Sequence, residues 1–360
     1  MKKTIQLNFI IIFCVAIMCS SINVYAETTL KGKSLKDSIL KKEKCVVRES
    51  NYVYIFCYFI KNGEDGLHLA YSKDGFNWSA LFDNKSILKP MVGDDKLMRD
   101  PCIIRGKDGK FHMVWTVSWK ERSIGYANST DLIHWSEQQN IPVMANEPTA
   151  QNCWAPEIFF DSKSKQYLIY WATSIPGRFP KSEQSNKKNH RMYYVVTKDF
   201  KVYSETRLLY DEGFSAIDAT IQKDKNKYVM FIKDEREIND GITKKKIFVA
   251  FSDSLYSGYR KINAITTDEY AAEGPTSIKV GNRWIVYFDK YMIGKYGAVS
   301  STDLVNWTDI SSLVSFPSGI RHGTVFLISK NEFEKIQSSL MTDKKYAFEN
   351  QHQRQNKACK

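Results

Sequence analysis

The stretch Val299-Ser-Ser-Thr-Asp303-Leu-Val-Asn-Trp307 decides the fold, because near copies of it recur along the chain. Each copy has an apolar or aromatic residue, a Ser or Thr, then an Asp, and a Trp or Tyr about four residues later. Successive copies lie about 50 to 70 residues apart in a chain of 360 residues. Self-similarity at such a period indicates a repeat architecture. The other copies are Tyr71–Trp78, Ala127–Trp135, Val196–Tyr203 and a weaker one, Phe251–Tyr259.

Two further patterns accompany each copy, and both have the composition of β-strands. One is an aromatic and β-branched run before the signature, and the other is a small or turn residue followed by a short apolar run. Clusters of Gly, Asn, Asp and Lys separate them, as turns require. Three or four strands per repeat are typical of propeller blades. The aromatic runs are Tyr52–Phe59, Phe111–Trp119, Tyr167–Thr173, Tyr228–Ile232 and Trp284–Phe288, and the opening runs are Asp100–Ile104, Ala155–Phe159, Asp218–Ile221, Gly274–Ile278 and His322–Phe326.

The two ends of the repeat series predict how the ring closes. The N-terminal strands, over residues 52–59 and 67–72, have no opening run before them, and the last opening run, residues 322–328, has no strands after it. Pairing these ends would complete one blade and remove a free sheet edge. The sequence therefore predicts an all-β fold, a five-bladed β-propeller in which the C-terminal strand pairs with the N-terminal blade. A solenoid or a β-sandwich would leave both ends unexplained.

The N-terminal residues predict export to the periplasm or the outside of the cell. Lys2 and Lys3 precede an apolar run over residues 9–18, and the small residues Val24 and Ala26 form a cleavage site, which together are typical of a secretory signal peptide. No second apolar stretch is long enough for a bilayer, so no membrane insertion is expected after cleavage. The expected division is a signal peptide over 1–26, a basic linker over 27–45, a catalytic propeller over 46–329 and a polar tail over 330–360.

Charge and cysteine content exclude some classes of partner and cofactor. The net charge is +12, which would suit an anionic polymer. Many lysines, however, lie in the flanks, and no basic run is interleaved with aromatic residues, so we expect no nucleic-acid partner. The cysteines have irregular spacing and form no Cys-x-x-Cys pair, which argues against a zinc site.

The residues that open the inner strands predict a site. The innermost strand of each blade lines the central channel, so its first residue lies at one mouth of that channel. Asp100, Asp218 and Glu273 hold such positions, and we expect the three acids to be structurally equivalent; the Trp154–Glu157 turn and His322 hold the other two. Gathering acids is costly unless they are used. Glycoside hydrolysis uses one protonated and one ionised carboxyl, and a third can tune their pKa values.

The motifs around these positions resemble those of glycoside hydrolase family 43, over roughly residues 50–328. That family contains five-bladed propeller arabinofuranosidases, arabinanases and xylosidases. The motifs that carry the resemblance are Met98-Arg-Asp-Pro-Cys-Ile-Ile104, Asn152-Cys-Trp-Ala-Pro-Glu157, Ser215-Ala-Ile-Asp-Ala-Thr220, Ala272-Glu-Gly-Pro275 and Arg321-His-Gly-Thr324.

The resemblance implies a role for each of these residues. Asp100 would be the general base that activates water, Glu273 the general acid, and Asp218 the residue that raises the pKa of Glu273 and orients it. Arg321 would bind a sugar hydroxyl. His322 would lie beside a central calcium ion or a water cluster, although the reaction itself would require no cofactor. The family inverts the configuration at the anomeric carbon.

Aromatic residues near the blade openings are expected to form a platform for the sugar ring. Trp154, Trp119 and Phe179 are the candidates. Glu157 stands where the family usually has Asp, and two roles remain open for it: a substrate contact, or a hydrogen-bond acceptor behind the site.

The expected function is an inverting hydrolase that releases a terminal pentose, first α-L-arabinofuranose, from plant-type polysaccharide or oligosaccharide. A β-xylosidase or β-galactofuranosidase on the same scaffold is the first alternative. A non-catalytic glycan-binding propeller is the second, and it would not need to retain all three acids.

Overall fold

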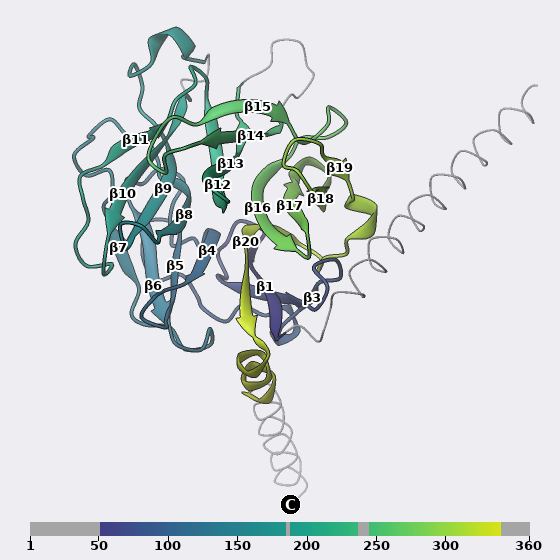
Figure 1. Cartoon of the computed structure of the whole chain (residues 1–360). Coiled ribbons are helices and arrows are strands. Elements are labelled where there is room, and N and C mark those ends of the chain that lie inside the picture. Colours follow the sequence, from purple (N-terminus) through teal and green to yellow (C-terminus); the bar gives the residue numbers. More distant parts are fainter. Residues whose placement is uncertain (1–50, 185–187, 237–244, 340–360) are drawn as a thin grey trace, which may run out of the picture. The chain divides into compact units, whose positions relative to one another are not determined.

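The computed structural model describes residues 51–184, 188–236 and 245–339. The expected signal peptide, the basic linker and the end of the C-terminal tail lie outside these described residues. Within them the chain forms five four-stranded antiparallel sheets and little helix (Figure 1). The prediction of an all-β, five-bladed propeller is confirmed.

Each blade is a meander whose opening run is the inner strand, so the sequence order predicts the order in the sheet. The first full blade is β4 (Arg99–Arg105), β5 (Phe111–Thr116), β6 (Ile124–Ser129) and β7 (Gln139–Ile141); the second is β8 (Trp154–Asp161), β9 (Gln166–Ser174), β10 (His190–Thr197) and β11 (Arg207–Tyr210); the third is β12 (Ala216–Asp224), β13 (Lys227–Asp234), β14 (Ile247–Ser252) and β15 (Arg260–Ala264); the fourth is β16 (Glu273–Val280), β17 (Arg283–Lys290), β18 (Lys295–Ser301) and β19 (Thr308–Asp309).

The fifth blade joins the two ends of the chain, as predicted. Its inner strand is the last one, β20 (Ile320–Ser329), followed in the sheet by β1 (Tyr52–Ile60), β2 (His68–Ser72) and β3 (Ser79–Ala80). Strand β20 pairs antiparallel with β1, from Tyr52 opposite Ser329 to Ile60 opposite Ile320. The five inner strands contact one another in the cyclic order β4, β8, β12, β16, β20. The ring is therefore closed by backbone hydrogen bonds between its first and last strands.

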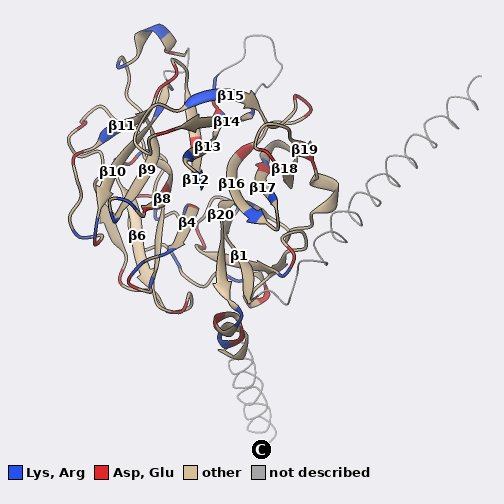
Figure 2. Ribbon diagram, viewed as in Figure 1, with Lys and Arg blue, Asp and Glu red and all other residues tan. Residues whose placement is uncertain are grey.

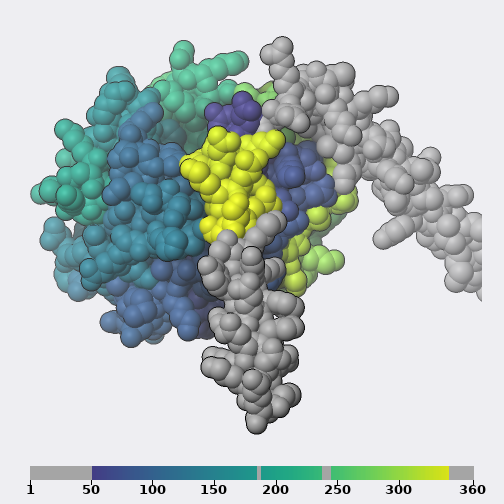
Figure 3. Space-filling view, turned by 90° about the horizontal axis from the view of Figure 1, so that it is seen from below, coloured from purple at the N-terminus to yellow at the C-terminus, as the bar shows by residue number. Residues whose placement is uncertain are grey.

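Short helices complete the described chain. Four 3-10 helices lie in the loops, and residues 330–339, directly after β20, are α-helical. Phe333 and Ile336 of this last helix pack into the cluster that also holds Val53 and Phe326. In Figure 3 the C-terminal segment (yellow) lies side by side with purple and blue segments from the N-terminal part of the propeller. The 3-10 helices are η1 (Phe82–Asn84), η2 (Pro180–Ser182), η3 (Tyr291–Ile293) and η4 (Ser311–Leu313).

The signature that revealed the repeat is a turn closed by side chains. In the copy that follows β6, the carboxylate of Asp131 accepts hydrogen bonds from the backbone N–H groups of Ile133 and His134, at 2.9 and 2.8 Å. The indole N–H of Trp135 donates to the carbonyl of Leu132 at 3.2 Å. Short polar side chains favour such turns because they replace backbone partners. The repeated spacing of Ser or Thr, Asp and Trp or Tyr along the chain therefore marks the same kind of turn in successive blades.

The core lies between neighbouring sheets. One buried cluster joins Cys102 and Val114 of one blade to Ile158 and Ile169 of the next. Such layers remove apolar surface from water on both faces of each blade. No helix of the described residues is both long and apolar enough to cross a membrane.

Candidate active site

The inner strands share a bulge at the mouth of the channel. Pairing with the neighbouring strand skips two residues in β4, β8, β12 and β16. The first skipped residue has a positive φ in each: 50° for Asp100, 47° for Ala155, 53° for Asp218 and 57° for Gly274. A bulge redirects side chains, and non-glycine residues in this backbone region are strained. The strain is therefore concentrated where the motifs lie.

The register of these bulges corrects one expectation. Asp100 and Asp218 hold the same bulge position, but Glu273 stands one residue earlier, level with Arg99 and Trp154. The bulge position of that blade is Gly274, where an added Cβ would lie 2.3 Å from Cγ of His322. Since the His322 ring occupies that space, the fourth blade supplies its acid from the preceding residue, and the three acids are not equivalent.

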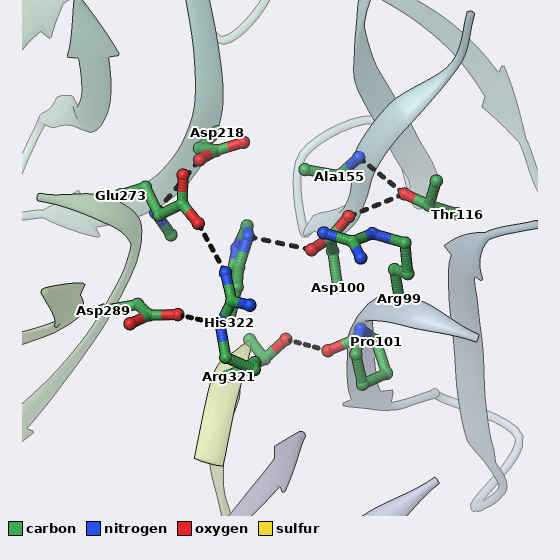
Figure 4. A network of polar contacts seen from close by, with 12 residues as sticks. Arg99, Asp100, Pro101, Thr116, Ala155, Asp218, Glu273, Asp289, Arg321 and His322 are labelled. Carbon is green, nitrogen blue, oxygen red and sulfur yellow. Dashed lines mark hydrogen bonds and ion pairs between the residues drawn. The ribbon is translucent and has the colours of Figure 1, made fainter. Parts of the chain in front are cut away.

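The structure brings the three predicted acids into one pocket of about 420 Å³. Figure 4 shows Asp100 on one side and Asp218 with Glu273 on the other, with His322 between them. In Figure 2, acidic and basic residues both occur on the strands around the centre. The pocket is lined by Lys61, Asn62, Arg99, Asp100, Trp119, Trp154, Lys188, Ile217, Asp218, Lys233, Glu235, Glu273, Tyr291, Arg321 and His322.

Asp100 is held as a carboxylate by its neighbours. The Thr116 hydroxyl donates to Oδ2 at 2.9 Å, and Nδ1 of His322 lies 3.3 Å from Oδ1. Burial opposes ionisation, but the hydrogen bond and charge of His322, with Arg99 and Thr116, outweigh it and lower the pKa of Asp100 to about 2. Asp100 is therefore ionised at neutral pH, which is the state that a general base must have.

Two cations hold the carboxylate of Glu273. Nζ of Lys233 donates to Oε2 at 2.9 Å, and the guanidinium of Arg321 donates to Oε1 at 3.0 Å. Arg321 is itself held by Asp289 at 2.6 Å, and Lys233, which is almost wholly buried, also pairs with Glu235 at 2.8 Å. Sequence reasoning identified Arg321 but missed Lys233, near the end of β13, and Glu235, just after it, because neither belongs to an opening run.

Asp218 lies next to Glu273 and contacts the backbone of the residue after it. Its Oδ2 accepts a hydrogen bond from the N–H of Gly274, the residue after Glu273, at 3.0 Å. Burial raises the pKa of Asp218 to about 6, although the charges of His322 and Lys233 oppose the rise; the charges of Glu273 and Asp100 add to it. Asp218 therefore contacts the backbone beside Glu273, and its role as a helper of Glu273 stays a prediction.

Trp119 and Trp154 form an aromatic wall of the pocket. Their rings meet edge to face, with centroids 5.6 Å apart, and the indole N–H of Trp154 donates to the carbonyl of Trp119 at 3.1 Å. Both positions were predicted for the sugar platform. The strand expected over residues 111–119 ends at Thr116, so Trp119 lies in the loop above it.

Glu157 and Phe179 were candidates for substrate contact, but neither lines this pocket. Glu157 follows the bulge of β8, and its buried carboxyl accepts a hydrogen bond from Tyr170 at 2.8 Å. Burial raises the pKa of Glu157 to about 7, against the hydrogen bonds of Thr220 and Tyr170. This fits the alternative of an acceptor behind the site. Phe179 instead lies against the guanidinium of Arg191, 4.3 Å from its ring centroid.

The described residues offer no evident ligand set for the calcium ion expected near His322. No group of three or more His, Cys, Asp or Glu in the described ranges could hold a metal ion. Burial lowers the pKa of His322, but its hydrogen bond to Asp100 and the charges of Asp218 and Asp100 outweigh this and raise it to about 9. A protonated ring donates to Asp100 and does not offer a lone pair, so calcium stays a prediction.

Comparison with known proteins identifies the family of this chain. Residues 49–334 match the model of the glycosyl hydrolase 43-related family, described as "Probable glycosyl hydrolase domain". The chain belongs to this family. A curated relative, an α-L-arabinofuranosidase of Bifidobacterium longum subsp. longum, is 26% identical over 207 residues. That match covers 50% of this chain and only 19% of the relative's length.

Solved structures show the same fold as this glycosyl hydrolase 43-related chain. An α-L-arabinofuranosidase from Clostridium thermocellum superposes with a TM-score of 0.53 at 14% identity, covering 77% of this chain and 94% of that one. A thermostable family-43 glycoside hydrolase gives 0.51 at 16% identity, covering 63% and 81%. The predicted resemblance to family 43 is confirmed.

Proposed function

We propose that this protein is an inverting glycoside hydrolase that releases terminal α-L-arabinofuranose from plant-type oligosaccharide or polysaccharide. The observation that carries the proposal is the pairing, in one pocket, of the ionised Asp100 with Glu273 and its helper Asp218. The named activity of the Bifidobacterium relative supports arabinofuranose as the first sugar to test.

In the proposed reaction one carboxyl takes a proton from water and the other gives a proton to the leaving group. Asp100 takes a proton from a water molecule as its oxygen attacks the anomeric carbon, and Glu273 gives its proton to the departing glycosidic oxygen. Asp100 ends protonated and Glu273 ends ionised, and both are reset by exchange with solvent. Because Lys233 and Arg321 contact both oxygens of Glu273, protonation of Glu273 requires that one contact give way.

Arg321 and Lys233 would then stabilise the product state. As Glu273 loses its proton, negative charge develops on oxygens that already face both cations. Charge that appears beside preorganised donors is stabilised without reorganisation of solvent.

A panel of nitrophenyl glycosides tests the proposal and its sugar. We expect hydrolysis of the α-L-arabinofuranoside and release of the inverted product. NMR identifies the anomer that forms first. Activity only on the β-D-xyloside or β-D-galactofuranoside would show that the enzyme releases that sugar and not arabinofuranose. A product with retained configuration would contradict the inverting mechanism.

Substitution of the two acids tests their roles. Asp100→Ala should abolish turnover even with a nitrophenolate leaving group, whereas Glu273→Ala should spare that substrate partly because a good leaving group needs no proton. Glu273→Gln should lower kcat by about a thousandfold or more while retaining sugar affinity. A glycan-binding propeller without activity would show no turnover on any of these substrates.

A further inference from the structure

A second hollow adjoins the proposed catalytic pocket. It has a volume of about 650 Å³ and shares Trp119, Trp154 and Lys188 with that pocket. The two indoles therefore line both hollows. A hollow of this size on the far side of an aromatic wall is large enough for a second sugar ring.

The aromatic wall is fixed from behind. His190, only 1% exposed, stacks on the ring of Trp154 with centroids 4.9 Å apart and planes at 29°. Neither ring nitrogen of His190 has a hydrogen-bond partner among the described residues. Burial lowers the pKa of His190 to about 3, so the ring is neutral and supports Trp154 by packing.

Arg99 presents a preorganised guanidinium at the same wall. It lies 4.2 Å from the ring centroid of Trp119 and 4.7 Å from that of Phe59. Its NH1 donates to Oδ1 of Asn62 at 2.8 Å, and the same oxygen accepts the indole N–H of Trp119 at 3.1 Å. The guanidinium thus contacts two rings and shares the acceptor Asn62 with one of them.

Some cations of the pocket are in ion pairs, whereas Arg99 acts on Asp100 only through its charge. Lys233 and Arg321 form ion pairs with Glu273. Among the described residues, no carboxylate lies within ion-pair distance of Arg99 or of Lys61, which lines the same pocket. A guanidinium matches a carboxylate, which it can bind through two parallel hydrogen bonds.

We propose that the sugar on the leaving-group side is a uronic acid, whose ring lies against the Trp119–Trp154 wall and whose carboxylate binds Arg99, with Lys61 adding charge. This inference rests on the proposed glycosidase function and names the class of glycan on which it acts. A neutral pocket would recognise sugar hydroxyls equally well, so the cations that form no ion pair are the feature that selects an acidic substrate.

Matched substrates test the inference. The test compares kcat/KM for an α-L-arabinofuranosyl uronic acid with kcat/KM for its methyl ester, which has almost the same shape but no charge. We expect the acid to be preferred about tenfold or more. The preference should decline as salt rises, since screening weakens attraction between exposed charges.

Variants assign the preference to Arg99. Arg99→Gln should reduce the ratio of acid to ester to near one, Arg99→Lys should retain part of it, and Lys61→Gln should reduce it less. The matched control is Arg178→Gln, an arginine outside the pocket that pairs with Glu147, which should leave the ratio unchanged. Melting temperatures confirm that each variant is folded.

The outcomes separate this inference from the proposed function. Equal kcat/KM for acid and ester in the wild type, with normal hydrolysis of the nitrophenyl arabinofuranoside, would overturn the uronate site and leave the glycosidase proposal standing. Failure to hydrolyse any of the substrates would overturn both. A second readout is the affinity of the Glu273→Gln variant for free uronic acid and for its methyl ester, measured by calorimetry. Equal affinities would also contradict the inference.

Discussion

At the scale of single residues, the site depends on side chains that act on one another over less than 3.5 Å. The Thr116 hydroxyl links two blades, because it donates to Asp100 and accepts the backbone N–H of Ala155 at 2.8 Å. Both Asp100 and Ala155 are in strained bulges, so this hydroxyl holds two of them in place.

Replacement of Thr116 tests that role. Thr116→Val should lower kcat on an aryl glycoside by about tenfold or more, because a hydrogen bond to a buried charge contributes about 1.5–3 kcal/mol and a buried N–H also loses its acceptor. Thr116→Ser is the control and should retain most of the activity. Equal kcat values for the Val and Ser variants would show that the hydroxyl does not support Asp100.

At the scale of an element, the repeated turn converts a local sequence motif into a blade. Burial opposes ionisation of Asp131, but hydrogen bonds from His134 and Ile133 outweigh it and lower its pKa to about 2. A carboxyl with a lowered folded-state pKa stabilises the protein above its unfolded-state pKa, and the contribution is lost as pH falls through the folded value.

Asp131→Asn should therefore destabilise the protein by about 1 kcal/mol at pH 7, since the turn resembles a helix cap and the group is partly exposed to screening. The difference from wild type should shrink between about pH 4 and pH 2. Urea unfolding at pH 7 and at pH 3 measures it. The control is Glu137→Gln, an exposed residue just after the same turn; a Glu137 effect as large as that of Asp131 would contradict the assignment.

At the scale of the whole molecule, stability depends on the closure between β20 and β1. Gly323 lies opposite Tyr58, where an added Cβ would come within 1.8 Å of the carbonyl oxygen of Cys57. That contact is with backbone, so no side-chain rotation relieves it. The joint between the chain's two ends therefore has no room for a side chain at this position.

Gly323→Ala should destabilise the propeller by about 3 kcal/mol, at the upper end for overpacking, because the strands must separate to admit the methyl group. Leu327→Ala is the matched control on the same strand: Leu327 is 40% exposed, and its loss should matter little. Denaturant unfolding of the two variants measures the difference. Similar stabilities would show that the closure tolerates local separation.

The sequence by itself determined the five blades, their closure and the three acids. Each of these follows from a local pattern that recurs, and a propeller brings the openings of its inner strands to one end of the channel. Asp100, Asp218 and Glu273 could be named because each opens such a strand.

Only the tertiary structure decided how those acids are held. Lys233, Arg321 and His322 contact the acids from other blades, across 40 to more than 200 residues of sequence, and no local pattern carries such pairings. The one-residue offset of Glu273 depends on the space that the His322 ring fills beside Gly274. Packing between distant segments has no signature in a single sequence, so charges, pKa values and the walls of the pocket emerged only from the folded chain.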